Sequence, residues 1–348
     1  MYGTTLRGLG VALALSLACQ GDDEQDDTGA VEEPGHELWR RSLPAQALAI
    51  AVGYDSSIAA TGVKGDSLWV GRFADDGDEL WSRTEPGYQG LSVAADPFET
   101  YVAAKPNDGA PGGRVLALDS DGSVLWTLDD AEREPRALAS APGGGVYAVG
   151  LVEDSPSIFI ERILPSGDVQ WVIEEDEVFG TTLDADSASD GVVVVTGSRD
   201  DGSWWVHARS SLGDPLWTTE LGQLVGPALP RVSRGGAWIH ASVLTQGEGS
   251  RGSVVELERT GEVRWIQPVD APPTDIASSG SQYGPLLLSI LVDPSINALG
   301  NGGAIEWSVE QDPDCPKTYA VVRRSAADAV ALRSCTAGGS QLVVFQVS

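Results

Sequence analysis

Short apolar runs separated by turn residues repeat along most of the chain. In one period, Arg136 to Ala141 precedes a Pro-Gly-Gly-Gly turn and is followed by Val146 to Val149, Ile158 to Leu164 and Val169 to Ile173. Such runs, bounded by glycine and proline, are typical of β-strands. Some middle runs, such as 192–195, are continuously apolar, which indicates a sheet buried on both faces. No stretch has a clear helical period, so the pattern predicts an all-β fold of four-stranded units.

One motif marks the end of each unit: a glycine, three further residues and a tryptophan. The tryptophans are 42 to 48 residues apart, which is the period of a four-stranded blade in a β-propeller. The glycine fits a tight turn between the third and fourth strands, where a positive φ favours glycine. Because they repeat at one place in every blade, the tryptophans are expected to pack between blades. The motif occurs at Gly35–Trp39, Gly77–Trp81, Gly122–Trp126, Gly167–Trp171, Gly213–Trp217, Gly261–Trp265 and Gly303–Trp307.

The two ends of the repeat region are incomplete in complementary ways. After Trp307 the chain has room for three strands, near 319–323, 329–335 and 342–347, and no eighth motif follows. The first motif has no strands before it, so it can supply the missing fourth strand. We therefore predict a seven-bladed β-propeller over residues 35–348, closed by pairing the N-terminal strand with the last blade, which removes exposed sheet edges.

The N-terminus has the features of an export signal. Arg7 precedes the apolar run Leu9 to Ala18, which is too short to span a bilayer. The run ends in Leu-Ser-Leu-Ala-Cys19, which resembles the lipobox of bacterial lipoproteins, and the next residue, Gln20, resembles the signal for passage to the outer membrane. The resemblance implies cleavage after residue 18 and a lipid on Cys19 that anchors the protein to a membrane of the cell envelope; ordinary cleavage without lipid is the alternative.

Residues 19–34 are predicted to form a disordered tether between the lipid and the propeller. From Gly21 to Gly35 the chain has seven acidic residues, no basic residue and almost nothing apolar. Such a segment cannot bury enough surface to offset its chain entropy. The predicted organisation is a signal peptide at 1–18, a tether at 19–34 and a propeller at 35–348.

Two cysteines remain once Cys19 is assigned to the lipid. Cys315 and Cys335 form an even pair in an exported protein, where oxidation is permitted. We predict one disulfide within the closing blade; two free buried thiols are the alternative.

The charge of the chain narrows the choice of partner. The formal net charge is −29, from 51 acidic and 22 basic side chains. This negative field repels phosphate backbones, so nucleic acid is excluded as a partner. Solubility is the favoured role of such a surface, and binding of a specific cationic ligand is the alternative.

The ends of several units resemble a known repeat. Leu116 to Trp126 and Val255 to Trp265, the latter with Thr260-Gly261, resemble the quinoprotein-type (PQQ-type) repeat, roughly Ala-x-Asp-x-x-Thr-Gly-x-x-x-Trp. The resemblance extends over nearly everything after Gly35 and implies a propeller. Such repeats occur in quinone-cofactor dehydrogenases and in non-enzymatic envelope lipoproteins. The calcium site and catalytic aspartate of the dehydrogenases are not recognisable here, so no cofactor is expected.

Other candidate chemistry is sparse. The three histidines, His36, His207 and His240, have no partner at metal-ligand spacing, so no metal site is expected. His207 and His240 lie in apolar strands and are expected to be hydrogen-bonded structural residues. The acidic run Asp184 to Gly191 has a faint likeness to a calcium loop, broken at Ala188. Nucleophile-elbow and phosphate-loop motifs are absent from the sequence.

Four tryptophans lie outside the repeated motif, at positions 69, 204, 205 and 238. Core packing is the favoured interpretation, and a ligand-binding aromatic is the alternative.

These patterns predict a non-enzymatic lipoprotein of the outer membrane that presents a propeller face to another envelope protein. The alternative is a secreted propeller enzyme, either a polysaccharide lyase or hydrolase or a diverged quinoprotein. A third hypothesis is a sugar- or peptide-binding module. Carboxylates converging at the central channel would favour the enzyme.

Overall fold

The computed structural model describes residues 34–176, 183–199, 203–223, 231–234, 238–245, 251–269, 273–278, 286–290, 296–300, 304–309, 312–323, 328–336 and 338–347. The chain divides into two units, Met1–Glu32 and Glu33–Ser348. The predicted signal peptide, Cys19 and nearly all of the predicted tether lie outside the described residues. The second unit carries all the structure described below.

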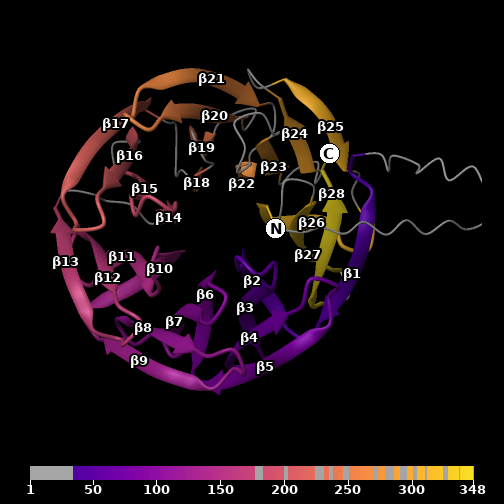
Figure 1. The fold of residues 1–348 in the computed structure, drawn as a ribbon, viewed down its shortest axis with the longest axis horizontal. Coiled ribbons are helices and arrows are strands. Elements are labelled where there is room, and N and C mark those ends of the chain that lie inside the picture. Colours follow the sequence, from indigo (N-terminus) through magenta and orange to yellow (C-terminus); the bar gives the residue numbers. More distant parts are fainter. Residues whose placement is uncertain are drawn as a thin grey trace, which may run out of the picture. The chain divides into compact units, whose positions relative to one another are not determined.

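Within the described residues, twenty-eight strands form seven four-stranded sheets, and every pairing between them is antiparallel (Figure 1). Six sheets are each built from four consecutive strands. In the first half of the chain these are β2 (Gln46–Val52), β3 (Ile58–Lys64), β4 (Ser67–Phe73) and β5 (Glu79–Pro86); β6 (Tyr88–Ala95), β7 (Thr100–Pro106), β8 (Gly113–Leu118) and β9 (Val124–Asp130); and β10 (Arg133–Ser140), β11 (Val146–Val152), β12 (Ile158–Ile163) and β13 (Val169–Glu175). In the second half they are β14 (Leu183–Ser187), β15 (Val193–Ser198), β16 (Ser203–Arg209) and β17 (Pro215–Gln223); β18 (Arg231–Arg234), β19 (Trp238–Thr245), β20 (Arg251–Glu258) and β21 (Val263–Val269); and β22 (Pro273–Ala277), β23 (Leu286–Ile290), β24 (Ile296–Leu299) and β25 (Ile305–Val309).

The remaining sheet is composite. It contains β26 (Lys317–Arg323), β27 (Asp328–Ser334), β28 (Ser340–Gln346) and, from the other end of the repeat region, β1 (Glu37–Leu43). β1 pairs antiparallel with β28, with Arg40 opposite Val343. The sequence predicted seven blades; in the structure six sheets are continuous blades, and the count reaches seven only when the composite sheet is included.

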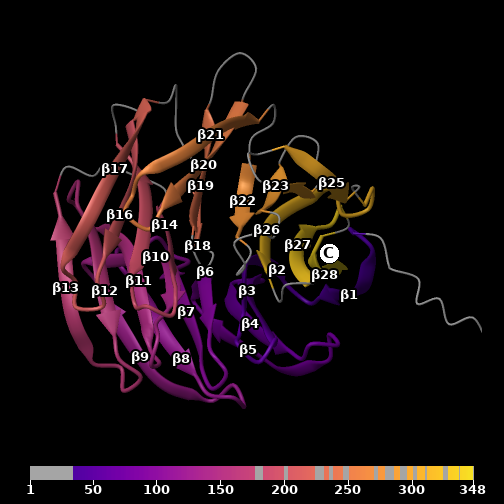
Figure 2. The same ribbon diagram turned by 45° about the horizontal axis from the view of Figure 1, so that its top comes forward.

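The sheets are arranged in a ring around a central opening (Figures 1 and 2). The innermost strand is the first strand of each continuous blade and β26 in the composite sheet. The core lies between neighbouring sheets. One buried cluster, for example, joins Val149 and Ile160 of one blade to Val195 and Trp205 of the next. All six residues of β12 are buried, which explains the continuous apolar runs, because each blade is covered on both faces.

The motif tryptophans join each blade to the next. Each is half-buried on the outermost strand of its sheet. The indole Nε1 of Trp126 donates to the carbonyl of Pro165 at 2.8 Å, and the ring lies against Gly167. Equivalent donations run from Trp39 to Asp75, from Trp171 to Ser211 and from Trp217 to Arg259. The tryptophans therefore pack between blades, as predicted, and Gly167 has the expected positive φ of 87°.

Substitution of a motif glycine measures how much the contact between glycine and tryptophan contributes to the free energy of unfolding. At Gly122 φ is +79°, and a Cβ would lie 2.8 Å from the Trp81 ring. We expect Gly122→Ala to lower the free energy of unfolding by about 2 kcal/mol, from backbone strain and overpacking together. Urea denaturation measures the loss.

Gly65→Ala is the matched control. Its φ is +62°, and no atom lies within 4 Å of the added Cβ. It should lose about 1 kcal/mol from backbone strain alone. Equal losses in the two variants would show that the tryptophan contact adds nothing at Gly122.

Candidate functional site at the central channel

A cavity of about 370 Å³ lies at the centre of the ring. All seven innermost strands line it: β2, β6, β10, β14, β18, β22 and β26. A concave space reached by every blade is the default place to look for a ligand in a propeller.

Charged residues from three consecutive blades form a row along one side of this cavity. Asp184 lies on β14, Arg231 on β18 and Asp275 on β22. Arg231 Nε is 3.9 Å from Asp275 Oδ1 and donates to the carbonyl of Thr274 at 3.2 Å. The guanidinium therefore places one positive charge close to two carboxylates.

The two carboxylates also connect the blades. Asp184 Oδ2 accepts the backbone N–H of Val232 at 2.9 Å. Asp275 Oδ2 accepts the backbone N–H of Val321 at 2.8 Å. A hydroxyl makes the equivalent contact elsewhere in the ring, where Ser92 Oγ accepts the N–H of Leu138 at 3.1 Å. In this row the charged side chains thus satisfy backbone donors of the following blade.

Burial perturbs both acids. It raises the pKa of Asp275 to about 7, assisted by the nearby charge of Asp184 and opposed by Arg231. Burial likewise raises the pKa of Asp184, against the attraction of Arg231 and the hydrogen bond from Val232. Carboxyls with such shifts in a cavity are candidates for proton transfer.

Asp275→Asn should change how stability depends on pH. Since the folded pKa of about 7 lies above the ordinary aspartate value of 3.8, the native state binds this proton more tightly than the unfolded state. The free energy of unfolding should therefore rise as the pH falls from 8 to 5, with Asp275 supplying up to about 1.4 kcal/mol per pH unit. The asparagine amide oxygen can still accept the Val321 N–H. Urea denaturation at several pH values between 8 and 5 should therefore show that the free energy of unfolding changes less with pH in the variant than in wild type.

Some pH dependence of the free energy of unfolding should remain in Asp275→Asn, because burial also raises the pKa of Glu161 to about 7. Asp121→Asn, which removes an exposed carboxylate, should keep the full pH dependence of wild type. The same pH dependence in Asp275→Asn as in wild type would contradict the prediction.

Two further charged side chains reach the cavity. Arg136 lies on β10, and its Nη2 is 2.9 Å from Glu134 Oε1. Asp186 lies on β14 and accepts the backbone N–H of Ser187 at 2.7 Å. The lining is therefore mixed, with aliphatic residues from β2 and β6 facing charged residues from β14, β18 and β22.

The acidic run with a likeness to a calcium loop does not form one ligand-bearing turn. Asp184 and Asp186 belong to the channel strand β14. Asp190 lies beyond its end, where Oδ1 accepts the N–H of Val192 at 3.0 Å. Within the described part of the chain, no three histidine, cysteine or acidic residues are grouped so as to hold a metal ion.

His207, which is half-buried, and His240, which is buried, are both hydrogen-bonded to glutamates, as the sequence predicted for structural histidines. His207 Nδ1 is 3.1 Å from Glu175 Oε2. Burial would raise the pKa of Glu175, but His207 and Arg209 outweigh it and lower that pKa to about 2. These contacts join neighbouring blades, because Glu175 ends β13 and the other two residues lie on β16.

The second histidine forms a network that sequence reasoning missed. His240 Nε2 is 3.0 Å from Glu256 Oε2, and its Nδ1 is 2.7 Å from Ser278 Oγ. This order resembles a serine, histidine and acid triad. All three residues are buried, and the Ser278 hydroxyl donates to the carbonyl of Ser233 at 2.9 Å. The network links the β18–β21 blade to β22.

The tryptophans outside the motif are mostly core residues. Trp69, Trp204 and Trp205 are fully buried. Trp238 instead stacks with Arg264, whose guanidinium carbon lies 3.8 Å from the ring centroid. Packing, the favoured interpretation, therefore accounts for three of the four.

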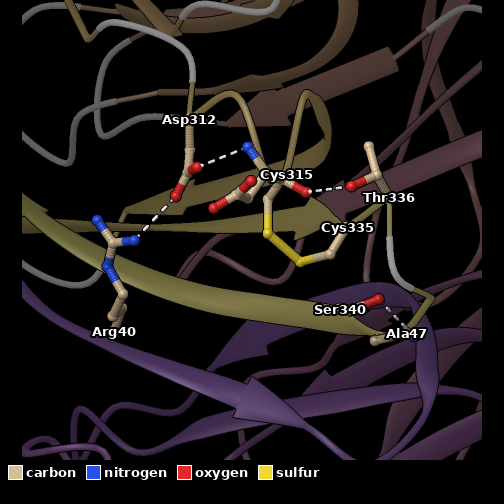
Figure 3. Close-up of a disulfide and its surroundings, with 8 residues drawn as sticks. Arg40, Ala47, Asp312, Cys315, Cys335, Thr336 and Ser340 are labelled. Atoms are coloured by element: carbon tan, nitrogen blue, oxygen red, sulfur yellow. Dashed lines mark hydrogen bonds and ion pairs between the residues drawn. A yellow bond between two sulfur atoms is a disulfide. The ribbon is translucent and has the colours of Figure 1, made fainter.

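The composite sheet is held by several contacts (Figure 3). A disulfide joins Cys315, just before β26, to Cys335, just after β27. Arg40 of β1 donates to Asp312 at 2.8 Å. Ser340 Oγ accepts the backbone N–H of Ala47 at 3.0 Å, which ties this sheet to the first continuous blade.

Exposed aromatic side chains stand on two neighbouring turns beside the channel. Tyr54, in the β2–β3 turn, also lines the cavity, and Phe98 lies in the β6–β7 turn. Each is 76% exposed. Sequence reasoning missed both, because a single aromatic in a turn carries no periodic signal.

A buried arginine connects these turns. Arg72 Nη2 lies 3.1 Å from Asp55 Oδ2 and donates to the carbonyl of Asp96 at 2.7 Å. Its Nε donates to Ser57 Oγ at 3.0 Å. Because Arg72 is only 2% exposed, this bonding holds both turns at a fixed separation.

Comparisons with known proteins agree with the fold. A family model described as outer membrane protein assembly factor BamB matches residues 16–150, which is less than half of the chain. No curated protein matches the sequence. Among the residues with a described conformation, no helix is long and apolar enough to cross a membrane.

Solved propellers superpose over most of the chain. Virginiamycin B lyase from Staphylococcus aureus has a TM-score of 0.62 and 12% identity, with 88% of this chain and 98% of that chain covered. The Dos1 propeller has a TM-score of 0.61 and 9% identity, with 90% of this chain and 86% of that chain covered. BBS1N, solved in complex with ARL6DN, has a TM-score of 0.59 and 12% identity, with 90% of this chain and 96% of that chain covered. At these identities the likeness concerns the fold alone. The repeats and these comparisons identify a β-propeller of PQQ-type repeats.

Proposed function

We propose that this chain is a non-enzymatic cell-envelope lipoprotein whose propeller is a docking surface for other envelope proteins. The observation that carries the proposal is the matched stretch at residues 16–150, which runs from the lipobox-like segment into the first blades and resembles an outer membrane assembly factor. A structural neighbour, BBS1N, was solved with a protein partner, ARL6DN. Docking to a protein is the role that both comparisons favour.

The site geometry supports a rigid platform. Asp184 and Asp275 in the channel bond to backbone groups of the next blade. The ring is closed by backbone pairing and stapled by a disulfide beside the closure. Rigid scaffolds lose little conformational freedom on binding, which favours affinity.

The membrane anchor is tested by mass. The native protein isolated from membranes should carry a diacyl or triacyl adduct on Cys19 and begin at that residue. Cys19→Ser should abolish the adduct and move the protein from the membrane fraction to the soluble fraction, because the lipid supplies the attachment. An unmodified wild-type protein in the soluble fraction would contradict the anchor.

Docking is tested in cells. A photo-crosslinking amino acid is placed at exposed positions of the propeller faces, including 54, 98 and 212. At least one of these positions should yield adducts with one or a few envelope proteins. Trp205, which is buried, is the position at which no adduct is expected. Absence of protein adducts from all exposed positions would contradict the docking role.

A second candidate function is an enzyme with its site in the channel. Asp275 favours it, because a carboxyl with a pKa of about 7 suits general acid–base work near neutral pH. A polysaccharide lyase or hydrolase is the expected class. Release of sugar fragments from envelope polysaccharide by the native protein, and its loss in Asp275→Asn, would establish this function in place of pure docking.

A further inference from the structure

We propose that the turns over the first two continuous blades bind a lysine- or arginine-containing segment of a protein partner. The surface consists of the β2–β3, β4–β5, β6–β7 and β8–β9 turns, here called the aromatic–acidic sector. The inference rests on the proposed docking function and names the chemistry of the partner.

The four turns lie at the same end of their blades. Within each antiparallel sheet, the turn between the first and second strands and the turn between the third and fourth strands lie at the same end of the strands. Arg72 joins the β2–β3 turn directly to the β6–β7 turn. Tyr54 and Phe98 therefore project from one continuous surface, and Tyr54 stands at the channel.

The two rings are presented by ordered backbone. Phe98 N–H donates to Asp96 Oδ1 at 2.8 Å, and Glu99 N–H donates to the same oxygen at 2.7 Å. In the other turn Asp55 Oδ1 accepts the N–H of Ser57 at 3.2 Å. Aromatic side chains that stay exposed on fixed loops are the usual anchors of protein interfaces.

The charge of the sector is one-sided. Its turns contain eight carboxylates and neither lysine nor arginine. Arg72 is buried beneath it and paired with Asp55. Two further arginines reach its edge: Arg41 of β1 lies 3.8 Å from Asp78 Oδ1, and Arg83 of β5 donates to the carbonyl of Gly122 at 3.4 Å. The carboxylates still outnumber these cations. The carboxylates are Asp55, Asp75, Asp76, Asp78, Asp96, Glu99, Asp119 and Asp121.

Aromatic rings beside carboxylates select cationic side chains. The face of a ring attracts lysine ammonium or arginine guanidinium groups, and the surrounding acids add a longer-range attraction. An acidic or neutral segment would gain only the apolar contact. A basic segment of a protein is therefore the occupant that this sector fits.

The test uses the full-length protein in detergent and a defined probe. The probe is a fluorescein-labelled twelve-residue peptide of alternating lysine or arginine with glycine and serine, read by fluorescence anisotropy. We expect Tyr54→Ala/Phe98→Ala to weaken binding at least tenfold. Leu212→Ala, at an apolar side chain 69% exposed in the third-to-fourth turn of another blade, should leave binding unchanged.

Two further variants separate the contribution of the aromatic rings from that of the carboxylates. Tyr54→Leu/Phe98→Leu keeps apolar area but removes the rings, and should weaken binding nearly as much as the alanine pair. Asp76→Asn/Asp121→Asn removes two charges; asparagine at 76 can still accept the Asp78 N–H that Asp76 Oδ1 accepts at 3.0 Å. It should weaken binding several-fold, and added salt should reduce the difference from wild type.

Three outcomes would overturn the inference. One is unchanged affinity in the alanine pair whose thermal unfolding matches wild type. Another is equal binding of a peptide with glutamate at the basic positions. The third is crosslinking in cells from position 212 but from neither 54 nor 98, which would leave the docking function standing. No crosslinks from any exposed position would contradict the docking function itself.

Discussion

Replacing both Cys315 and Cys335 by serine should lower the free energy of unfolding by about 3 kcal/mol. The bond closes a loop between residues 20 positions apart, and in the chain-entropy view it removes conformations from the unfolded state. In the composite sheet it connects Cys315, two residues before β26, to Cys335, the residue after β27. Urea denaturation of the double variant against the oxidised wild type measures the effect.

Reduction gives an independent comparison. Wild type in excess dithiothreitol should match the double variant, because both lack the same covalent link. If the oxidised wild type and the double variant unfold at the same urea concentration, the bond does not stabilise the sheet. An intact mass lower than that of the reduced chain by two hydrogen atoms would distinguish the disulfide from two free thiols.

Arg72→Met should lower the free energy of unfolding by about 3 kcal/mol. The guanidinium is buried and bonded to Asp55, Ser57 and the carbonyl of Asp96, and removing it leaves these groups without their charged donor. Methionine retains much of the side-chain volume, so the loss reports mainly on polar contacts. Because the same bonds fix the turns of the aromatic–acidic sector, amide hydrogen exchange should rise in residues 53–57 and 96–99.

A matched variant separates burial from ion pairing. Arg199→Met removes a bidentate pair with Glu220 whose arginine side chain is 30% exposed. Exposed pairs contribute little, so the expected loss is below about 1 kcal/mol. Similar losses in the two variants would show that burial of Arg72 has no special importance.

The spacing of glycine and tryptophan predicted most of the fold. The spacing is informative because the glycine of each motif forms a local turn and the tryptophan packs against the next blade. Gly167 makes the tight turn before β13, and the Trp126 ring from the preceding blade lies against it. The complementary ends of the repeat region likewise indicated the pairing of β1 with β28. In the structure the seven motifs correspond to six continuous blades and the composite sheet.

The channel and its mouth were not predictable in the same way. Asp184 and Asp275 are 91 positions apart in the sequence, and they approach only because each lies on an innermost strand. The acidic run that begins at Asp184 has a faint likeness to a calcium loop, but its first residues form β14. The proximity of Tyr54 to the turn of Phe98 depends on Arg72, a residue on a third segment. No local pattern encodes such a junction.

The composite sheet sets the order in which the molecule can be completed. β1 is the first strand of the propeller to be synthesised, and its partner β28 is the last. Until β28 arrives, β1 has an unpaired edge, and unpaired edges associate readily with other strands. The final step of folding must therefore wait for nearly the whole chain. Loss of the last ten residues would leave both ends of the propeller unpaired at once.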